Sequence, residues 1–540
     1  MTTGTRVLGG TKGGKDIVPF RLFDLRNLEL NKVTGEAKLM YMPGVDLNNC
    51  EDVLLDTPTN PRYQLSVLKE YLITKNNRVC VLYGLRRTGK TTLIRQAIKW
   101  LIEERGIQPS EIFYVTVKDP RQALLDDIVD SFREGTYKYA FLDEVSFCSD
   151  FISTCAQLYD AFTSMTGQKI VIAGTNLVSI FVAKLHRLYD RTYRIPVHHL
   201  TFYEHCRFNG IINPGLEEFN DYLKHGGLFE RDLDAFEYVR SAIITHLEST
   251  ILNSDVQSLY AWFSNSGFKD YSGLVHNILL YSVGINVNSQ TVRAAYSFKR
   301  ESSLINLDDE VRSAMQKRLD LLKYTSVFMK ETELHAFVKF LEDCGLLLTL
   351  KNIAQDAMPG DIAKTYITFP FIRFAYTVEL AKMGGVPEPE LRNEYLGSLM
   401  EVCAISEYHL AFPQDLIYFW RERIKGVPTE CDLIITNCID PGRGPHRAAF
   451  EIKASKKSNK GQRGFEKFAI LHPEYEILPE NCKVIGGEDV VDWVYELGRL
   501  AYISAGLEDP TLKRIVIPEK KVGAQRTSAF GDLNGWNMGN

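Results

Sequence analysis

Short apolar runs alternate with amphipathic stretches between residues 78 and 203. The runs VCVLYG, IFYVTV, YAFLDE and KIVIAGT have the length and composition of buried strands, and stretches of helical period separate them. This alternation is typical of a parallel sheet wrapped by helices. Before it, Leu65, Leu68 and Leu72 follow the spacing of a helix face and predict a helix.

After about residue 203 the strand pattern fades, and residues 230–350 are mostly helical in period. The segment SGLVHNILLYSVGINVNSQTVRAAY predicts an apolar helix, a turn at Gly284, a cap at Asn288 and a short helix over 289–296, which suits a helix-turn-helix. That short helix could enter a DNA groove through Gln290 and Arg293, or serve only as a packing unit. The later ETELHAFVKFLEDCGLLLTL predicts a helix that runs into a strand, as in a winged helix.

The bulk composition restricts the possible partners. The 540 residues include 63 basic and 68 acidic side chains, for a formal charge of −5, so any nucleic-acid site must be local. The ten cysteines form no CxxC pair and no Cys/His cluster at zinc spacing, which argues against disulfides and structural zinc and favours a cytoplasmic location. No stretch reaches the roughly 18 uninterrupted apolar residues of a membrane helix, so we expect no membrane partner.

The stretch GLRRTGKT, residues 84–91, fits G-x-x-x-x-G-K-[ST] between an apolar strand and an amphipathic helix. In this pattern, called a P-loop, backbone amides curl around a phosphate, Lys90 reaches the β and γ oxygens, and the Thr91 hydroxyl can ligate magnesium. The pattern therefore predicts ATP and Mg²⁺ as ligands. The predicted nucleotide contacts are Gly84, Arg86, Arg87, Thr88, Gly89, Lys90, Thr91 and Thr92.

A strand that ends in two acids, YAFLDE, follows the P-loop by about fifty residues. We expect Asp143 to hold the magnesium shell with Thr91, and Glu144 to orient or deprotonate the attacking water. A strand ending in two acids can also be only a solvated strand end. Its position after a P-loop favours the functional interpretation.

Two further features could complete an ATPase site. Thr175 and Asn176 end the strand KIVIAGTN, where a side chain could touch the γ-phosphate or only cap a turn. Of the arginines 187, 191 and 194 that follow, Arg191 is our candidate for stabilising charge, in cis or toward a neighbouring subunit. The alternative for each is an ordinary surface arginine.

These motifs resemble a large family of prokaryotic AAA+ ATPases. The resemblance rests on GLRRTGKTTL, FLDE, AGTN and the run from Arg191 to PVHHLTFYEH, and it extends over roughly residues 60–500. HHLTFYEH replaces the family's PLSFxE, which keeps a helix start plausible and leaves the role of Glu204 open. YLKHGGLFE is similar to the family's GGFPE turn. The resemblance implies a winged-helix region and a C-terminal domain resembling the PD-(D/E)xK nucleases.

The C-terminal part contains acids that suit this implied nuclease. PTECDLIITN and AAFEIKAS predict two strands, with Asp432 on the first and Glu451 and Lys453 on one face of the second. Glu401 lies on an apolar helix, where a buried acid needs a partner or a metal. Asp432 and Glu451 could hold a divalent metal against a scissile phosphate while Lys453 activates water. An E-x-K pattern on a strand also occurs by chance.

Basic residues near these acids predict a surface for nucleic acid, DNA rather than RNA. They gather in KASKKSNKGQRGFEK and at Arg421, Arg423 and Lys425, although such a run can also be a solvated face.

We therefore predict a multidomain α/β protein. Its parts are an N-terminal extension (1–55), an AAA+ P-loop domain with a parallel sheet (56–228), a helical winged-helix region (229–384), a restriction-endonuclease-like α/β domain (385–510) that follows the Gly/Pro-rich linker MGGVPEPEL, and a tail (511–540). ATP hydrolysis would regulate a nuclease, a combination suited to prokaryotic defence. The rival hypotheses are an ATP-gated switch that binds DNA or protein through an inactive nuclease fold, and an ATP-driven loader that docks a partner protein. The oligomeric state stays open.

Overall fold

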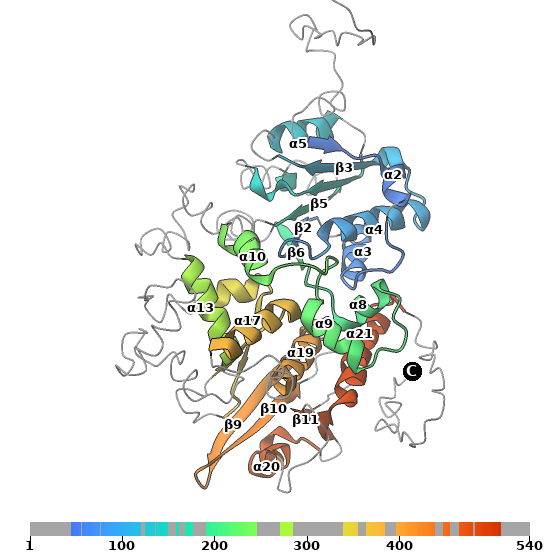
Figure 1. Cartoon of the computed structure of the whole chain (residues 1–540). Coiled ribbons are helices and arrows are strands. Elements are labelled where there is room, and N and C mark those ends of the chain that lie inside the picture. The colour runs from blue at the N-terminus through green and yellow to red at the C-terminus, as the bar shows by residue number, and fades with distance from the viewer. Residues whose placement is uncertain are drawn as a thin grey trace, which may run out of the picture.

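The computed structural model places two sheets at opposite ends of the molecule, with helices between them (Figure 1). It describes residues 45–55, 57–75, 77–119, 125–134, 137–148, 158–160, 168–175, 191–245, 271–284, 338–354, 363–383, 396–437, 447–453, 464–478 and 481–508. No helix in these ranges is long and apolar enough to span a bilayer.

The first sheet has six strands in the order β1-β3-β4-β5-β2-β6, and all neighbours except β1 and β3 are parallel. Alternation along β2 sends Val79 and Val81 into one core cluster and Cys80 and Leu82 into the cluster on the other face. Both faces are therefore buried, which explains the continuous apolar runs and confirms the predicted parallel sheet. The strands are β1 (Val45–Leu47), β2 (Val79–Tyr83), β3 (Ile112–Val117), β4 (Tyr139–Asp143), β5 (Lys169–Gly174) and β6 (Thr192–Pro196).

Helices and short helical turns accompany this sheet. The helix predicted from Leu65, Leu68 and Leu72 is present and buries these three side chains. The strand β1 pairs with β3, so the sheet already begins inside the predicted N-terminal extension. The elements are α2 (Cys50–Leu55), α3 (Leu65–Ile73), α4 (Lys90–Glu103), α5 (Leu125–Glu134), η3 (Pro109–Glu111) and η4 (Val145–Phe147).

The middle of the chain forms a helical layer beside a two-stranded hairpin. Residues 338–343 are helical and run into β7, as the sequence predicts, and β7 pairs antiparallel with β8. The apolar helix α13 is present as predicted and is described up to Gly284, whereas the predicted turn and the short helix over 289–296 lie outside the described part of the chain. The elements are α10 (Ala235–Val239), η6 (Arg240–Ile244), α13 (Tyr271–Gly284), β7 (Leu347–Lys351), β8 (Ala363–Ile367) and α17 (Pro370–Met383).

The C-terminal domain is a four-stranded sheet in the order β12-β11-β10-β9, flanked by helices. The β11 and β12 strands are parallel, and the other neighbours are antiparallel. The predicted linker begins where α17 ends, and the described chain resumes at α19. The elements are α19 (Leu396–Ala411), β9 (Leu416–Ile424), β10 (Val427–Asn437), β11 (Ala448–Lys453), α20 (Gly464–Leu471), η10 (Pro473–Tyr475), β12 (Cys482–Gly486) and α21 (Glu488–Ser504).

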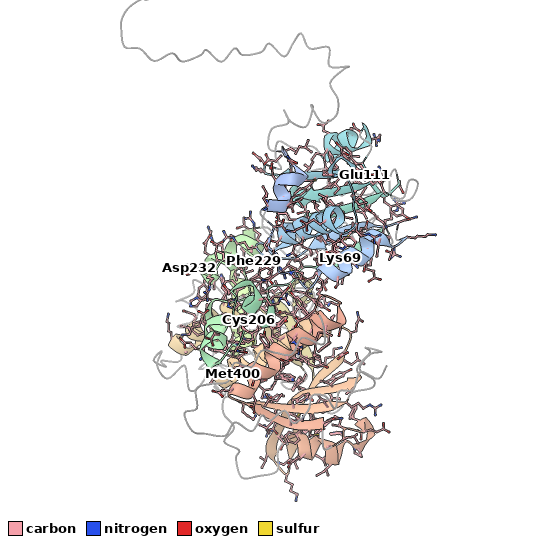
Figure 2. All side chains as sticks on the ribbon, turned by 90° about the vertical axis from the view of Figure 1, so that its right-hand side faces the viewer. Lys69, Glu111, Cys206, Phe229, Asp232 and Met400 are labelled. Carbon is pink, nitrogen blue, oxygen red and sulfur yellow. The ribbon has the colours of Figure 1, made fainter. Side chains whose placement is uncertain are left out.

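Two helices connect the first sheet to the C-terminal domain. The helices α8 (Phe202–Phe208) and α9 (Leu216–His225) share one hydrophobic core with α19, β11 and α21. Cys206 of α8 and Met400 of α19 both belong to this core (Figure 2). The boundary predicted at residue 228 therefore does not follow the packing, because α8 and α9 precede it in sequence but bury their apolar faces in the C-terminal core.

Glu407 of α19 is buried where these helices meet and predicts a pH-dependent stability. Its carboxylate accepts hydrogen bonds from the Phe202 amide at 3.1 Å and the Tyr222 hydroxyl at 2.6 Å. Burial raises the pKa of Glu407 from its ordinary 4.5 to about 8, against the opposing effect of these bonds. Because the folded-state pKa is raised, the contribution of Glu407 to the free energy of unfolding is full below pH 4.5. This contribution is lost as the pH rises from there through about 8. The free energy of unfolding should fall by about 1.4 kcal/mol per pH unit in this window.

The measurement is the urea midpoint of unfolding between pH 5 and 8. A Glu407→Gln variant should remove this contribution to the slope, because the amide mimics the protonated carboxyl and does not titrate. Equal slopes in the wild type and the variant would contradict the prediction.

Candidate functional site

The predicted P-loop joins β2 to α4, and α4 begins at Lys90. Gly89 precedes the helix with a φ of 92°, a left-handed conformation that favours glycine. A Cβ at this position would lie 2.5 Å from the Arg62 guanidinium and 2.7 Å from the Phe229 ring. Glycine is therefore required here for both backbone conformation and space.

Lys90 lies inside the loop, with 3% of its surface exposed. Its ammonium donates to the carbonyl oxygens of Gly84 at 3.0 Å and Leu85 at 2.8 Å. Burial lowers the pKa of Lys90 to about 8, and the charges of Glu144 and Asp143 oppose this shift. A phosphate at this position would supply a counter-charge directly to the ammonium and favour its charged form.

Thr91 of the P-loop and Asp143 at the end of β4, which are predicted to hold magnesium together, are in contact. The Thr91 hydroxyl donates to Asp143 Oδ2 at 2.7 Å. Burial raises the pKa of Asp143 to about 6, although the Thr91 bond opposes the shift. Among the described residues, Asp143 Oδ1 is a buried oxygen without a hydrogen-bond partner. An unsatisfied carboxylate oxygen beside a hydroxyl is a suitable donor set for Mg²⁺ and fits the predicted cofactor.

Glu144 follows Asp143 with a positive φ of 59°, at the carboxyl end of β4. The Thr175 hydroxyl donates to Glu144 Oε2 at 3.0 Å. Since β5 lies between β2 and β4, Thr175 at its end stands between the P-loop and the acids. Thr175 thus contacts the proposed catalytic carboxylate, whereas Asn176 lies outside the described residues.

The other predicted loop contacts differ in exposure. Arg86 and Arg87 are exposed, and Arg87 forms an ion pair with Glu230. The Arg86 carbonyl accepts a hydrogen bond at 2.6 Å from Tyr238, a residue of α10. Thr88 is buried, and Thr92 is half-buried at the start of α4. The helical layer therefore touches the P-loop directly.

Arg191 does not lie near the P-loop. Its carbonyl accepts from the Val79 amide at 2.9 Å, and β6 runs parallel to β2 from this point. The P-loop follows the other end of β2, about 16 Å away over five strand residues. The Arg191 guanidinium instead pairs with Asp160 at 3.0 Å. A role of Arg191 in cis is thus inconsistent with the structure, and a role toward a neighbouring subunit stays a prediction.

The P-loop, its flanking strand and the acids at the end of β4 lie in a segment that matches a known family model. Residues 76–206 match the family described as AAA domain. The AAA domain so defined ends within α8, the helix that also enters the C-terminal core. No curated protein matches the chain in sequence.

Solved structures with partial similarity include three nucleotide- or DNA-bound proteins. ORC1 from Aeropyrum pernix in complex with DNA is 14% identical over 65% of this chain and 96% of its own, with a TM-score of 0.22. The Hsp104-ADP complex of S. cerevisiae is 12% identical over 69% and 61%, with a TM-score of 0.28. AMPPCP-bound DnaA from Aquifex aeolicus is 17% identical over 52% and 95%, with a TM-score of 0.24. TM-scores this low do not establish a shared overall fold. The match of residues 76–206 to the AAA domain and the P-loop geometry identify this segment.

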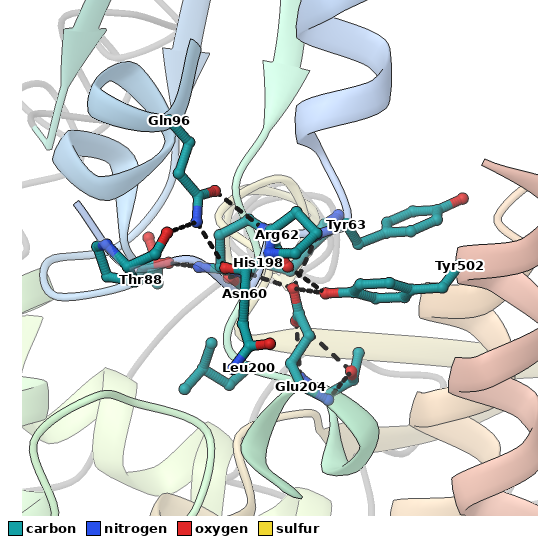
Figure 3. A network of polar contacts seen from close by, with 12 residues as sticks. Asn60, Arg62, Tyr63, Thr88, Gln96, His198, Leu200, Glu204 and Tyr502 are labelled. Carbon is teal, nitrogen blue, oxygen red and sulfur yellow. Dashed lines mark hydrogen bonds and ion pairs between the residues drawn. The ribbon is translucent and has the colours of Figure 1, made fainter. Parts of the chain in front are cut away.

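Arg62, which precedes the matched segment 76–206, contacts the P-loop and was not predicted from the sequence (Figure 3). Its guanidinium contacts the Thr88 carbonyl of the P-loop and pairs with Glu204 at 2.9 Å, and neither side chain is exposed. Glu204 Oε2 accepts from the Thr201 amide at 3.1 Å and caps α8, so the open role of Glu204 is now explained. The T-x-x-E spacing in LTFYEH is the signal that could have identified this cap.

The structure brings three of the four predicted nuclease residues together on β10 and β11. Lys453 Nζ lies 3.5 Å from Asp432 Oδ2 and 3.8 Å from Glu451 Oε2. Asp432 also accepts from the Ile452 amide at 2.8 Å, and Glu451 accepts from the Gly464 amide. Burial raises the pKa of Glu451, and the charge of Lys453 opposes this shift.

Glu401, the fourth predicted residue, joins Asp432 through a residue that was not predicted, Glu430. One carboxylate oxygen from each of these three acids lies within 4.8 Å of the others. The ammonium of Lys364, on β8, lies 3.4 Å from Glu401 and contacts Glu430, with 3% of its surface exposed. Burial raises the pKa of Glu401 to about 7, while Lys364 opposes the shift. Glu430 is two residues before Asp432, so strand alternation could have identified it.

This acidic cluster therefore already has cationic partners. Arg421 donates to Glu430 at 2.7 Å and is only 14% exposed, so it does not join a basic surface as predicted. Arg423 and Lys425 are exposed, and residues 454–463 of the basic run lie outside the described chain. The carboxylate donors suit a divalent cation, but Lys364 lies among them, so the arrangement fits a metal only after this ammonium moves.

Proposed function

We propose that the chain binds ATP at the P-loop of its AAA domain and hydrolyses it. The observation that carries the proposal is the pair of Thr91 and Asp143, with the unsatisfied Asp143 Oδ1 beside Lys90 and Glu144. Four groups that phosphoryl transfer requires thus converge from β4 and the start of α4.

In this mechanism Lys90 leaves the carbonyl oxygens of Gly84 and Leu85 and donates to the β and γ oxygens of ATP. When bound, Mg²⁺ would neutralise phosphate charge. Thr91 and Asp143 would hold it. Glu144 orients a water for attack and accepts its proton, and Thr175 fixes the direction of the Glu144 carboxylate.

The finer proposal is that the nucleotide state regulates a nuclease-like C-terminal domain acting on DNA, beside a winged-helix region. Its support is the set of Asp432, Glu451 and Lys453 on neighbouring strands, with Glu401 close to Asp432. Two acids and a lysine suit metal-assisted hydrolysis of a phosphodiester. Arg191, on the surface of the AAA domain, would act only toward a neighbouring subunit of an oligomer.

A specific observation favours the alternative function, an ATP-gated switch that binds DNA or a partner protein without cleaving. Lys364 pairs with Glu401 and Glu430 where a divalent cation would otherwise lie. Acids that are already paired with a cation of the chain would preserve the fold without the chemistry.

The experiment for the ATPase is replacement of Glu144 by glutamine. The amide cannot accept the proton of the attacking water, so we expect turnover to fall by about a hundredfold or more. ATP affinity should stay within about threefold, since Lys90, Thr91 and Asp143 are unchanged. Phosphate release and equilibrium binding of a fluorescent ATP analogue measure the two quantities.

Glu103→Gln is the matched control, because Glu103 is an exposed acid at the end of α4 and pairs only with Lys99 in the described structure. It should leave both quantities unchanged. Turnover by Glu144→Gln at the wild-type rate would exclude Glu144 as the catalytic base.

A further inference from the structure

Arg62 connects four parts of the structure at one buried point. Its guanidinium contacts the Thr88 carbonyl in the P-loop, the Glu204 carboxylate at 2.9 Å and the His198 carbonyl at 3.0 Å. Its backbone amide donates to the Gln96 side chain of α4 at 2.9 Å. The guanidinium is planar and rigid. If it rotates to change its contact with Thr88, its contacts with Glu204 and His198 change as well.

Glu204 receives a second connection, which comes from the far end of the chain. The Tyr502 hydroxyl of α21 lies 3.0 Å from Glu204 Oε1 and 2.8 Å from the Pro61 carbonyl (Figure 3). The Tyr63 amide donates to the same Oε1 at 2.9 Å. The contacts of Arg62 and Tyr63 lower the pKa of Glu204 against the effect of burial. A charged carboxylate between a guanidinium and a hydroxyl forms short, direction-dependent hydrogen bonds.

The helix α21 is held tightly at this position. A Cβ on Gly498 would lie 2.3 Å from Tyr203 Cβ, so α21 and α8 approach as closely as glycine allows. One turn later, Arg207 of α8 pairs with Glu508 beyond the end of α21 at 3.0 Å. Movement of Tyr502 relative to Glu204 thus requires movement of α21 against α8, and α21 belongs to the C-terminal core.

We infer that Arg62 is a positioning residue for the P-loop, and that Glu204 and Tyr502 make its position depend on the C-terminal helix α21. The relay runs from the Thr88 carbonyl through the buried side chains of Arg62, Glu204 and Tyr502, and so joins the P-loop to the C-terminal domain. This inference rests on the proposed function, because it assigns the route by which ATP binding and the C-terminal domain affect each other. Such coupling is reciprocal: whatever displaces α21 changes the affinity for ATP.

The experiment compares Tyr502→Phe with the wild type in the full chain. Removal of the hydroxyl takes one donor from Glu204 and leaves the ring in place, so Arg62 is held less firmly against Thr88. We expect the KM and the dissociation constant for ATP to rise about fivefold, with kcat within about twofold, because Tyr502 is remote from the reacting phosphates. Hydrogen exchange should show that ATP with Mg²⁺ protects residues 498–504 in the wild type and not in the variant.

Tyr408→Phe is the matched control, since the Tyr408 hydroxyl donates to Asp415 at 2.7 Å within the C-terminal domain. It should keep both the wild-type affinity and the ATP-dependent protection. Arg62→Lys is the second variant: it keeps the charge but loses the planar fork, and should weaken ATP binding at least as much as Tyr502→Phe.

The inference is overturned if Tyr502→Phe keeps the wild-type affinity and the ATP-dependent protection of α21. It also fails if the wild type hydrolyses ATP while residues 498–504 show no response to it. In both cases the proposed ATPase function stands. If the wild type binds no ATP at all, the proposed function itself is wrong, so the two failures are distinguishable.

Discussion

Replacement of Lys90 by alanine is expected to lower ATP turnover by at least about a hundredfold. Lys90 is the buried cation of the P-loop, and its ammonium is already directed into the loop by two carbonyl oxygens. Loss of one preorganised donor to the charge that develops in phosphoryl transfer typically costs about 10²–10³ in rate. The ground-state phosphates lose the same contact, so ATP affinity should fall as well. Phosphate release at saturating ATP and direct binding measure the two effects.

The matched control is Lys99→Ala, which removes a lysine from the same helix where it pairs with Glu103 at 3.8 Å at the surface. It should hydrolyse ATP at the wild-type rate. A Lys90→Ala protein with wild-type turnover would place ATP hydrolysis elsewhere and would end the assignment of Lys90, Thr91 and Asp143.

The P-loop could be predicted from the sequence because its geometry is local. A strand, a glycine-rich turn and a helix start lie within about thirty consecutive residues, and their backbone geometry fixes where Lys90 and Thr91 point. Asp143 was predicted because it ends a strand about fifty residues after the P-loop, and the carboxyl ends of parallel strands meet at one edge of a sheet. Only the pairing of Thr175 with Glu144 needed the strand order, which the sequence does not contain.

Residues whose partners are distant in sequence could not be predicted in this way. Arg62 and Glu204 lie 142 positions apart, and Glu204 and Tyr502 lie 298 apart. Their burial depends on the packing of α8 against α21, which no periodicity encodes. The pattern of α8 shows that one face is apolar but not which core that face enters. Lys364 was missed for the same reason, because nothing near it in sequence indicates its two acidic partners, Glu401 and Glu430, on other elements.

The two candidate sites therefore differ in how their acids are paired. In the AAA domain, Thr91 donates a hydrogen bond to Asp143. Asp143 Oδ1 has no hydrogen-bond partner in the part of the chain that the structure describes. In the C-terminal domain, the acids are paired with Lys364, Arg421 and Lys453. If a nuclease is present, its activation requires the Lys364 ammonium to leave Glu401 and Glu430. The AAA domain is the part of the chain that could supply the energy for such a movement.

Cleavage of DNA should depend on Lys453 if the C-terminal domain is a nuclease. We expect Lys453→Ala to reduce cleavage of plasmid and linear DNA by about a hundredfold or more in magnesium or manganese, because this lysine lies against both Asp432 and Glu451 and is the group available to stabilise charge. Lys364→Met should have the opposite effect and raise cleavage or lower the metal concentration needed, since it removes the ammonium that competes with the cation. Gel assays with and without ATP measure both.

Lys483→Ala is the control, an exposed lysine of similar charge on the neighbouring strand β12, paired in register with Phe450. It should cleave as the wild type does. The opposite outcome is that neither the wild type nor Lys364→Met cleaves DNA while ATP turnover is intact. In that case the ion pairs of Lys364 with Glu401 and Glu430 are structural and do not block a metal site. The acids then preserve the shape of the domain, and ATP controls what the domain binds instead of what it cuts.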